Sequence, residues 1–128
     1  MSKEPRSANL YLLNFALLFS HEIDSAFWKE WDLFGIPGGI QVFLLLNFLL
    51  LLAALWGFRQ VLQGARGGRW FSLLLATAGI FAFSIHTYFI LAGRPEFTLP
   101  ASLALLGLIL IVSLVQLLST LKDWAHIK

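Results

Sequence analysis

Cysteine is absent from this chain of 128 residues, so disulfide bonds, thiolate metal ligands and cysteine nucleophiles are excluded. Charged residues are also scarce: they make up 12% of the sequence, whereas soluble proteins carry roughly 25%. Hydrophobic residues make up 59%, which is more apolar surface than a soluble domain of this size can bury. The composition therefore predicts an integral membrane protein with a single domain, residues 1–128.

Four apolar segments are candidates for membrane spans, each of which takes about 20 helical residues. The first apolar run, 10–19, is too short by itself, so its helix is expected to continue into the polar residues 20–24. These residues do not fit a signal-peptide cleavage site, and the span is expected to stay uncleaved. The stretch 27–34 interleaves aromatic and charged residues, which predicts an interfacial turn or short helix before a glycine turn at 35–39. The predicted fold is an all-α bundle of four transmembrane helices, at about 8–25, 40–58, 70–92 and 101–121.

Lysine and arginine are distributed unevenly among the connections between these spans. Seven of the nine lie in the amino tail, the second connector and the carboxyl tail, and two lie in the other connectors. Because cytoplasmic segments carry the excess of positive charge, both termini are predicted to be cytoplasmic. The seven are Lys3, Arg6, Arg59, Arg66, Arg69, Lys122 and Lys128, and the two are Lys29 and Arg94.

This topology places the embedded ionisable side chains at the outer end of the bundle. His21, Glu22 and Asp24 end the first span, and His86 lies about six residues, or roughly 9 Å, below the outer end of the third. Ionisable groups in a membrane are costly unless they pair, bind a metal or meet water. His21 and Asp24, three residues apart, would ligate one divalent ion such as zinc, with His86 as the third ligand. Glu22, or Glu96 of the last outer loop, would then act as the catalytic acid or base.

The same residues also have structural interpretations. The acidic and histidine group at 21–24 would equally cap the helix end and pair with Lys29 or Arg94, and His86 would equally be a hydrogen-bonded core histidine. The sequence contains no His-Glu-x-x-His motif and no phosphate-loop spacing. A metal site therefore stays a hypothesis at this stage.

The order His-Glu-x-Asp at 21–24, Glu30-Trp31, a histidine at 86 and Glu96-Phe97 resembles a family of small four-helix bacterial membrane proteins catalogued as a domain of unknown function. The resemblance covers about 10–118. It implies a four-helix bundle in the bacterial inner (plasma) membrane and brings no activity with it. The chain departs from the pattern at Asn47, where a histidine is often found, and this departure weakens a three-histidine metal site.

Three functions compete, and the sequence leaves open whether the protein is an enzyme. The first is a divalent-metal-dependent hydrolytic or lipid-modifying site. The second is a structural or accessory membrane subunit, or a small transporter. The third is a b-type haem protein for electron transfer, with His21 and His86 as axial ligands; the negative charge of Glu22 and Asp24 disfavours it. The expected partners are membrane lipids and another copy or membrane subunit. Nucleic acid is not expected, because the net charge is only +2.

Overall fold

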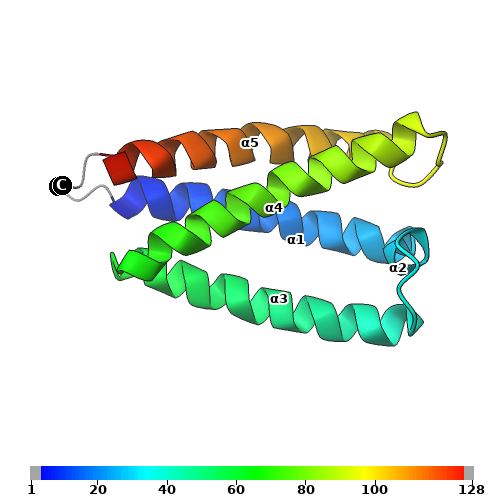
Figure 1. Ribbon diagram of the computed structural model, residues 1–128, viewed down its shortest axis with the longest axis horizontal. Helices are drawn as coiled ribbons and strands as arrows, with labels where there is room; N and C mark the ends of the chain where they lie inside the picture. Colours follow the sequence, from blue (N-terminus) through cyan, green and yellow to red (C-terminus); the bar gives the residue numbers. More distant parts are fainter. Residues whose placement is uncertain (1–3, 126–128) are drawn as a thin grey trace.

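The computed structural model describes residues 4–125, and all regular secondary structure in this range is helical, as predicted. Lys3 and Lys128, two of the predicted cytoplasmic charges, lie outside it. A short helix, α2, joins the first long helix to the second (Figure 1). The four long helices are α1 (Glu4–Phe27), α3 (Gly39–Leu62), α4 (Arg66–Leu91) and α5 (Pro100–Ala125), and α2 is Glu30–Leu33.

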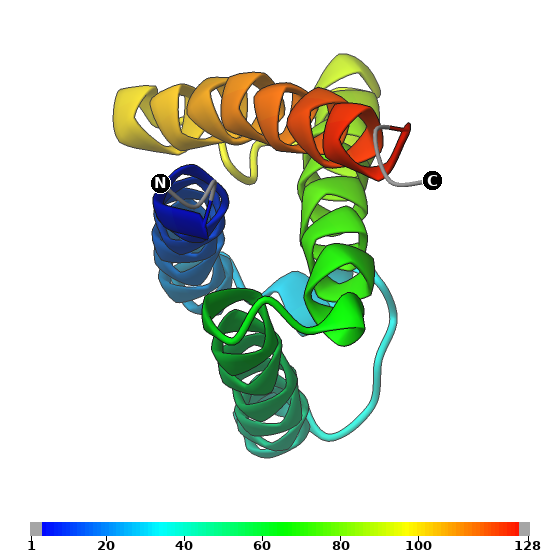
Figure 2. The same cartoon turned by 90° about the vertical axis from the view of Figure 1, so that its left-hand side faces the viewer.

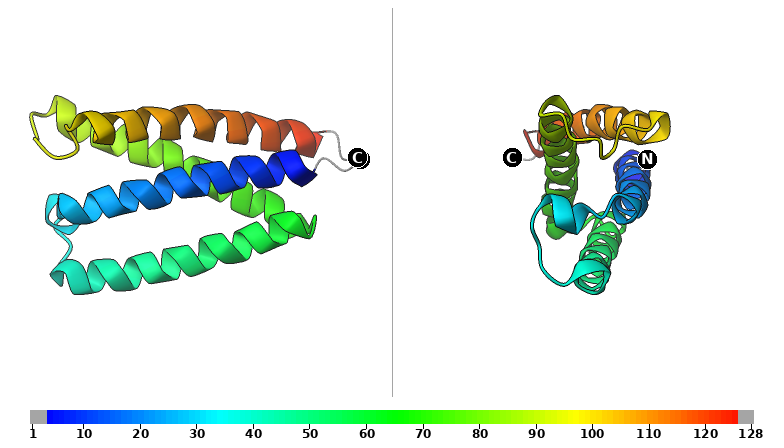
Figure 3. Two further views of the ribbon diagram at one scale, coloured as in Figure 1. Left: turned by 180° about the vertical axis from the view of Figure 1, so that it is seen from behind. Right: turned by 90° about the vertical axis from the view of Figure 1, so that its right-hand side faces the viewer.

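Successive long helices run in opposite directions along the molecule (Figures 1 and 3). The beginning of α1, the turn between α3 and α4 and the end of α5 therefore share one end, which we call the terminal end. The opposite end, which we call the α2 end, contains α2 and the loop between α4 and α5. Seen from the terminal end, α1 and α4 each lie between α3 and α5, and the four helices surround a common interior (Figure 2).

Three of the helices, α3, α4 and α5, are long and apolar enough to cross a membrane. α1 is as long as α3, and it continues from the apolar run through 20–24 to Phe27, as the shortness of that run predicted. Polar residues in its first and last turns make it less apolar than the other three, and it is not among the described helices found apolar enough to cross a membrane. The helices also extend beyond the predicted spans: Arg59 lies in the last turn of α3 and Arg66 begins α4, which reduces their connector to 63–65.

The glycine turn predicted at 35–39 is confirmed. Gly35, Gly38 and Gly39 all have positive φ angles, a conformation in which a side chain would be strained. The turn leads the chain from α2 into α3, and Gly38 caps the amino end of that helix. It leaves α2 lying across the end of the bundle, where the candidate site is found (Figure 1).

The interior is as polar as it is apolar, and most large apolar side chains face outward. Asn14 of α1 donates hydrogen bonds to Ser113 Oγ (3.1 Å) and Gln116 Oε1 (2.7 Å) of α5, all three residues being buried. On α4, Gly79 brings its backbone against Ser113. Small residues and interhelical hydrogen bonds are the means by which helices associate in lipid, where apolar burial supplies little driving force.

Candidate metal-binding site

The site is built where α1, α2 and α4 meet at the α2 end. α1 ends at Phe27, and Lys29 takes a left-handed conformation (φ 53°) that turns the chain into α2. Glu30, the first residue of α2, thereby lies beside His86 of α4, and its side chain is only 14% exposed. Burial raises the pKa of the Glu30 carboxyl above its ordinary value.

The two histidines predicted to approach each other do so. The ring centroids of His21 (α1) and His86 (α4) are 4.8 Å apart, with an angle of 69° between the ring planes. Each residue is 1% exposed. Two imidazoles from different helices therefore share one buried volume, the arrangement expected from their predicted common depth at one end of the bundle.

Glu30 completes a group of three possible metal ligands with these histidines. His86 Nε2 lies 3.7 Å from Glu30 Oε1. One nitrogen or oxygen from each of His21, Glu30 and His86 lies within 4.8 Å of the other two. A tetrahedral ion with bonds of about 2 Å holds its ligand atoms roughly 3.3 Å apart. Small side-chain rotations would therefore bring the three atoms onto one ion.

Four buried polar atoms of this region lack a hydrogen-bond partner within the described chain: His21 Nδ1, His86 Nδ1, Glu30 Oε2 and Asp24 Oδ2. Leaving a buried polar atom unpaired costs about 1–3 kcal/mol. Two of the four are carboxylate oxygens, which only accept hydrogen bonds, and imidazole nitrogens are metal ligands in their neutral form. A cation in the middle of the group would relieve this shortage of donors.

Phe97, in the loop between α4 and α5, covers the histidine pair. Its ring centroid lies 4.0 Å from that of His86 and 5.3 Å from that of His21, and the residue is 1% exposed. Its φ of 66° is unusual for a bulky residue and costs of order 1–3 kcal/mol. Packing against the two imidazoles holds this conformation.

The three acidic residues proposed from the sequence are placed differently. Asp24 accepts a hydrogen bond from Trp28 Nε1 (3.0 Å) and lies outside the three-residue ligand group. Glu22, two residues before Asp24 on the same helix, lies near Glu30 and near Asn47 of α3. Among the described residues, Glu30, and not the predicted Asp24, joins the two histidines in the ligand group.

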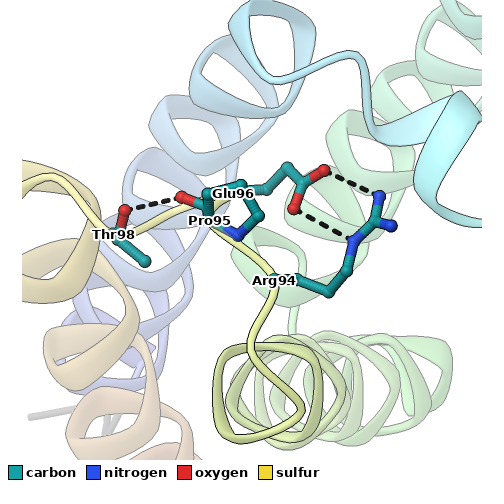
Figure 4. A network of polar contacts seen from close by, with 4 residues as sticks. All are labelled: Arg94, Pro95, Glu96 and Thr98. Atoms are coloured by element: carbon teal, nitrogen blue, oxygen red, sulfur yellow. Dashed lines mark hydrogen bonds and ion pairs between the residues drawn. The ribbon is translucent and has the colours of Figure 1, made fainter.

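Glu96 is engaged elsewhere. Its carboxylate receives two hydrogen bonds from the Arg94 guanidinium, at 2.8 and 3.3 Å, and this pair lies on the exposed loop between α4 and α5 (Figure 4). Thr98 donates to the Pro95 carbonyl and ties the same loop together (Figure 4). Glu96 therefore holds the loop that carries Phe97, and the ligand group does not include it.

Glu30 is the ligand candidate that the sequence did not single out. In the sequence, Glu30 is an acidic residue within the aromatic stretch that follows 21–24, and it was named only as part of the family resemblance. Spacing along the chain does not encode the direction in which α2 turns. That direction depends on the left-handed residue Lys29 and on the packing of the bundle end.

A model of the family described as "Family of unknown function (DUF6713)" matches residues 7–123. The chain belongs to this family. The match contains every residue of the site and confirms the resemblance to a family of unknown function that the sequence indicated. No curated protein and no solved structure matches the chain. For this DUF6713 protein, the chemistry of the site is therefore argued from its geometry.

Proposed function

We propose that this DUF6713 protein binds a divalent metal ion, preferably zinc, through His21, Glu30 and His86, and that the ion catalyses a hydrolytic reaction at the outer surface of a membrane. The observation that carries the proposal is the group of three ligand atoms within 4.8 Å, surrounded by buried polar atoms that lack partners. Two histidines and one glutamate form one of the ligand sets of catalytic zinc, which keeps a fourth position for water.

Such an ion lowers the pKa of its bound water to near 7 and so supplies hydroxide at neutral pH. Glu22 is the favoured base, because it lies near Glu30, whereas Glu96 is bound to Arg94. With an ion held by His21, Glu30 and His86, Glu22 would accept a proton from the attacking water and return it to the leaving group of the cleaved bond, while the ion would supply the Lewis acidity. A site at the end of an apolar bundle favours a lipid substrate. We therefore propose that the reaction modifies a lipid by hydrolysis.

The proposed setting is a bacterial inner membrane, crossed four times, with both termini in the cytoplasm. At the terminal end, Arg59 lies over the Trp56 ring (5.4 Å) and Arg69 over the Trp124 ring (5.9 Å). Tryptophans beside cations are typical of the headgroup region, and cytoplasmic segments carry the excess of arginine. These contacts support a cytoplasmic terminal end, which leaves the metal site facing outward.

The haem alternative is disfavoured by the distance between the histidines. Two axial imidazoles bind on opposite faces of the iron, and with bonds of about 2 Å their ring centroids lie roughly 6 Å apart. The observed 4.8 Å leaves no room for a macrocycle between His21 and His86. The same distance suits two ligands on neighbouring positions of one small ion.

Zinc titration of the purified protein in detergent tests the proposal. We expect one zinc per chain, and at least about 100-fold weaker binding in the His21→Ala, Glu30→Gln and His86→Ala variants, because each removes one of three protein ligands. Asp32→Asn is the matched control, since Asp32 is an exposed acid on the same short helix. If the wild-type chain binds no zinc, or if all three variants bind as tightly as the control, the metal site does not exist.

A further inference from the structure

One face of α4 changes from charged to apolar along its length, starting at the terminal end. Arg66, Trp70 and Leu74 follow one another at intervals of four residues, and Phe81 comes seven residues after Leu74. At this helical spacing the four side chains lie on one side of the helix. All four are exposed, so the other described helices leave this side uncovered. We call it the exposed α4 face.

The length of this face matches one leaflet of a bilayer. Trp70 and Phe81 are 11 positions apart, which corresponds to about 16 Å along a helix. Half of a hydrocarbon core is about 15 Å thick. Tryptophan is enriched at the boundary between headgroups and hydrocarbon. With Trp70 at this boundary, Leu74 and Phe81 lie at the depth of acyl chains, and Arg66 lies at the level of the headgroups.

A second arginine and a second tryptophan lie at the same level. Arg69 follows Arg66 by three residues, so the two are neighbours on the surface of α4. The Arg69 guanidinium lies over the Trp124 ring of α5, 5.9 Å from its centroid. The rings of Trp70 and Trp124 meet edge to face, with their centroids 4.8 Å apart. These contacts join α4 to α5 and hold one of the two arginines in place.

Neither arginine has an anionic partner within the described part of the chain. Arg94, at the other end of the molecule, is bound to Glu96, but no described carboxylate forms an ion pair with Arg66 or Arg69. Asp123, the residue next to Trp124, pairs with neither. Guanidinium groups bind phosphate oxygens through parallel N–H···O hydrogen bonds. Two neighbouring arginines without a counter-ion therefore suit a phosphate at the headgroup level.

We propose that Arg66 and Arg69 bind the phosphate diester of an anionic phospholipid, and that its acyl chains lie along the exposed α4 face. A lipid with net negative charge is favoured over a zwitterionic one, because the site offers positive charge and no carboxylate to receive a choline ammonium. The lipid belongs to the leaflet at the terminal end, whichever side of the membrane that end faces. The metal site lies at the opposite end of the bundle and plays no part in this inference (Figure 1).

Quenching of tryptophan fluorescence by brominated phospholipids tests the proposal. The full chain is placed in phosphatidylcholine vesicles, and brominated phosphatidylglycerol is compared with brominated phosphatidylcholine. An arginine near an anionic headgroup raises affinity about 5-fold, so the wild-type chain should prefer phosphatidylglycerol by at least about 5-fold. Arg66→Gln and Arg69→Gln should each lower this preference by about 5-fold. Arg69→Lys keeps the charge but loses the planar fork, so its loss should be smaller than that of Arg69→Gln.

Arg6→Gln is the matched control, because it removes the same charge from the same end of the molecule. Arg6 is exposed and belongs to α1, which lies across the interior from α4 (Figure 2). This variant should lower the preference by less than about 2-fold, since charges in headgroup regions are screened within roughly 8–10 Å. Helical circular dichroism checks that each variant is folded.

Three results would overturn the lipid site. The first is a wild-type chain without preference for phosphatidylglycerol, a result that needs no variant. The second is an equal loss in Arg6→Gln and Arg69→Gln, which would indicate attraction to the whole charged surface. The third is displacement of phosphatidylglycerol by inorganic phosphate at constant ionic strength, which would indicate a site for free phosphate. None of these measurements requires zinc, so a failure of the proposed function would leave them unchanged.

Discussion

Replacing Gly79 by alanine should push α4 away from α5. A Cβ at Gly79 would collide with Ser113 Oγ and lie 3.1 Å from both Ser113 Cβ and Ile109 Cγ2. Ser113 cannot simply turn aside, because its hydroxyl is hydrogen-bonded to the buried Asn14. The added methyl group must therefore either break the hydrogen bond between Asn14 of α1 and Ser113 of α5 or separate α4 from α5.

The expected change in the free energy of unfolding combines two destabilising contributions and one stabilising contribution. Overpacking a close contact costs about 1–3 kcal/mol. Losing an interhelical hydrogen bond in a membrane protein costs roughly 0.6 kcal/mol on average and up to about 1.7 kcal/mol. Alanine favours a helix over glycine by about 1 kcal/mol. The expected net loss in the free energy of unfolding is therefore about 1–3 kcal/mol.

Gly107→Ala is the matched control. Gly107 lies inside α5, and a Cβ there would meet nothing within 4 Å, so only the helix preference acts and the variant should be up to about 1 kcal/mol more stable. Unfolding in detergent mixtures of increasing denaturing strength, followed by helical circular dichroism, measures both variants. The double variant Gly79→Ala/Ser113→Ala should regain part of the loss, because it removes the hydroxyl that collides. Equal stability of the Gly79 and Gly107 variants would refute the close approach of α4 and α5.

Two further predictions concern the site and its orientation. Burial raises the pKa of Glu30, and its carboxyl must lose a proton to bind zinc. Acidification should therefore weaken zinc binding at a higher pH than it would for an exposed glutamate, whose pKa is about 4.3. Zinc titrations between about pH 8 and 5 measure this, and a constant affinity would contradict it. Since the chain has no cysteine, single cysteines report topology: one at Ile36 should react with an impermeant reagent from outside, and one at Gly67 only after the membrane is breached. The opposite pattern would move the site to the cytoplasmic face.

The helical fold could be predicted from the sequence because its signals are local. The shortness of the apolar run 10–19 required the first helix to continue through 20–24, and α1 does so to Phe27. Aromatic and charged residues at 27–34 and the glycines at 35–39 predicted the short helix and the turn, which are α2 and the segment before α3. Each of these inferences needs only the rise of a helix and the conformational preferences of the residues concerned.

The sequence by itself also determined that His21 and His86 lie at the same depth, because counting residues along a helix measures height within a bundle. Only the tertiary structure decided which side chains meet at that height. Helical spacing favoured Asp24 as the carboxylate beside the histidines, whereas the left-handed Lys29 turns α2 so that Glu30 reaches His86. The partner of Glu96 was likewise decided by its loop, where Arg94 binds it. Depth follows from a position along one helix, but a contact between helices depends on how their small and polar residues pack, and this is a property of all the helices together.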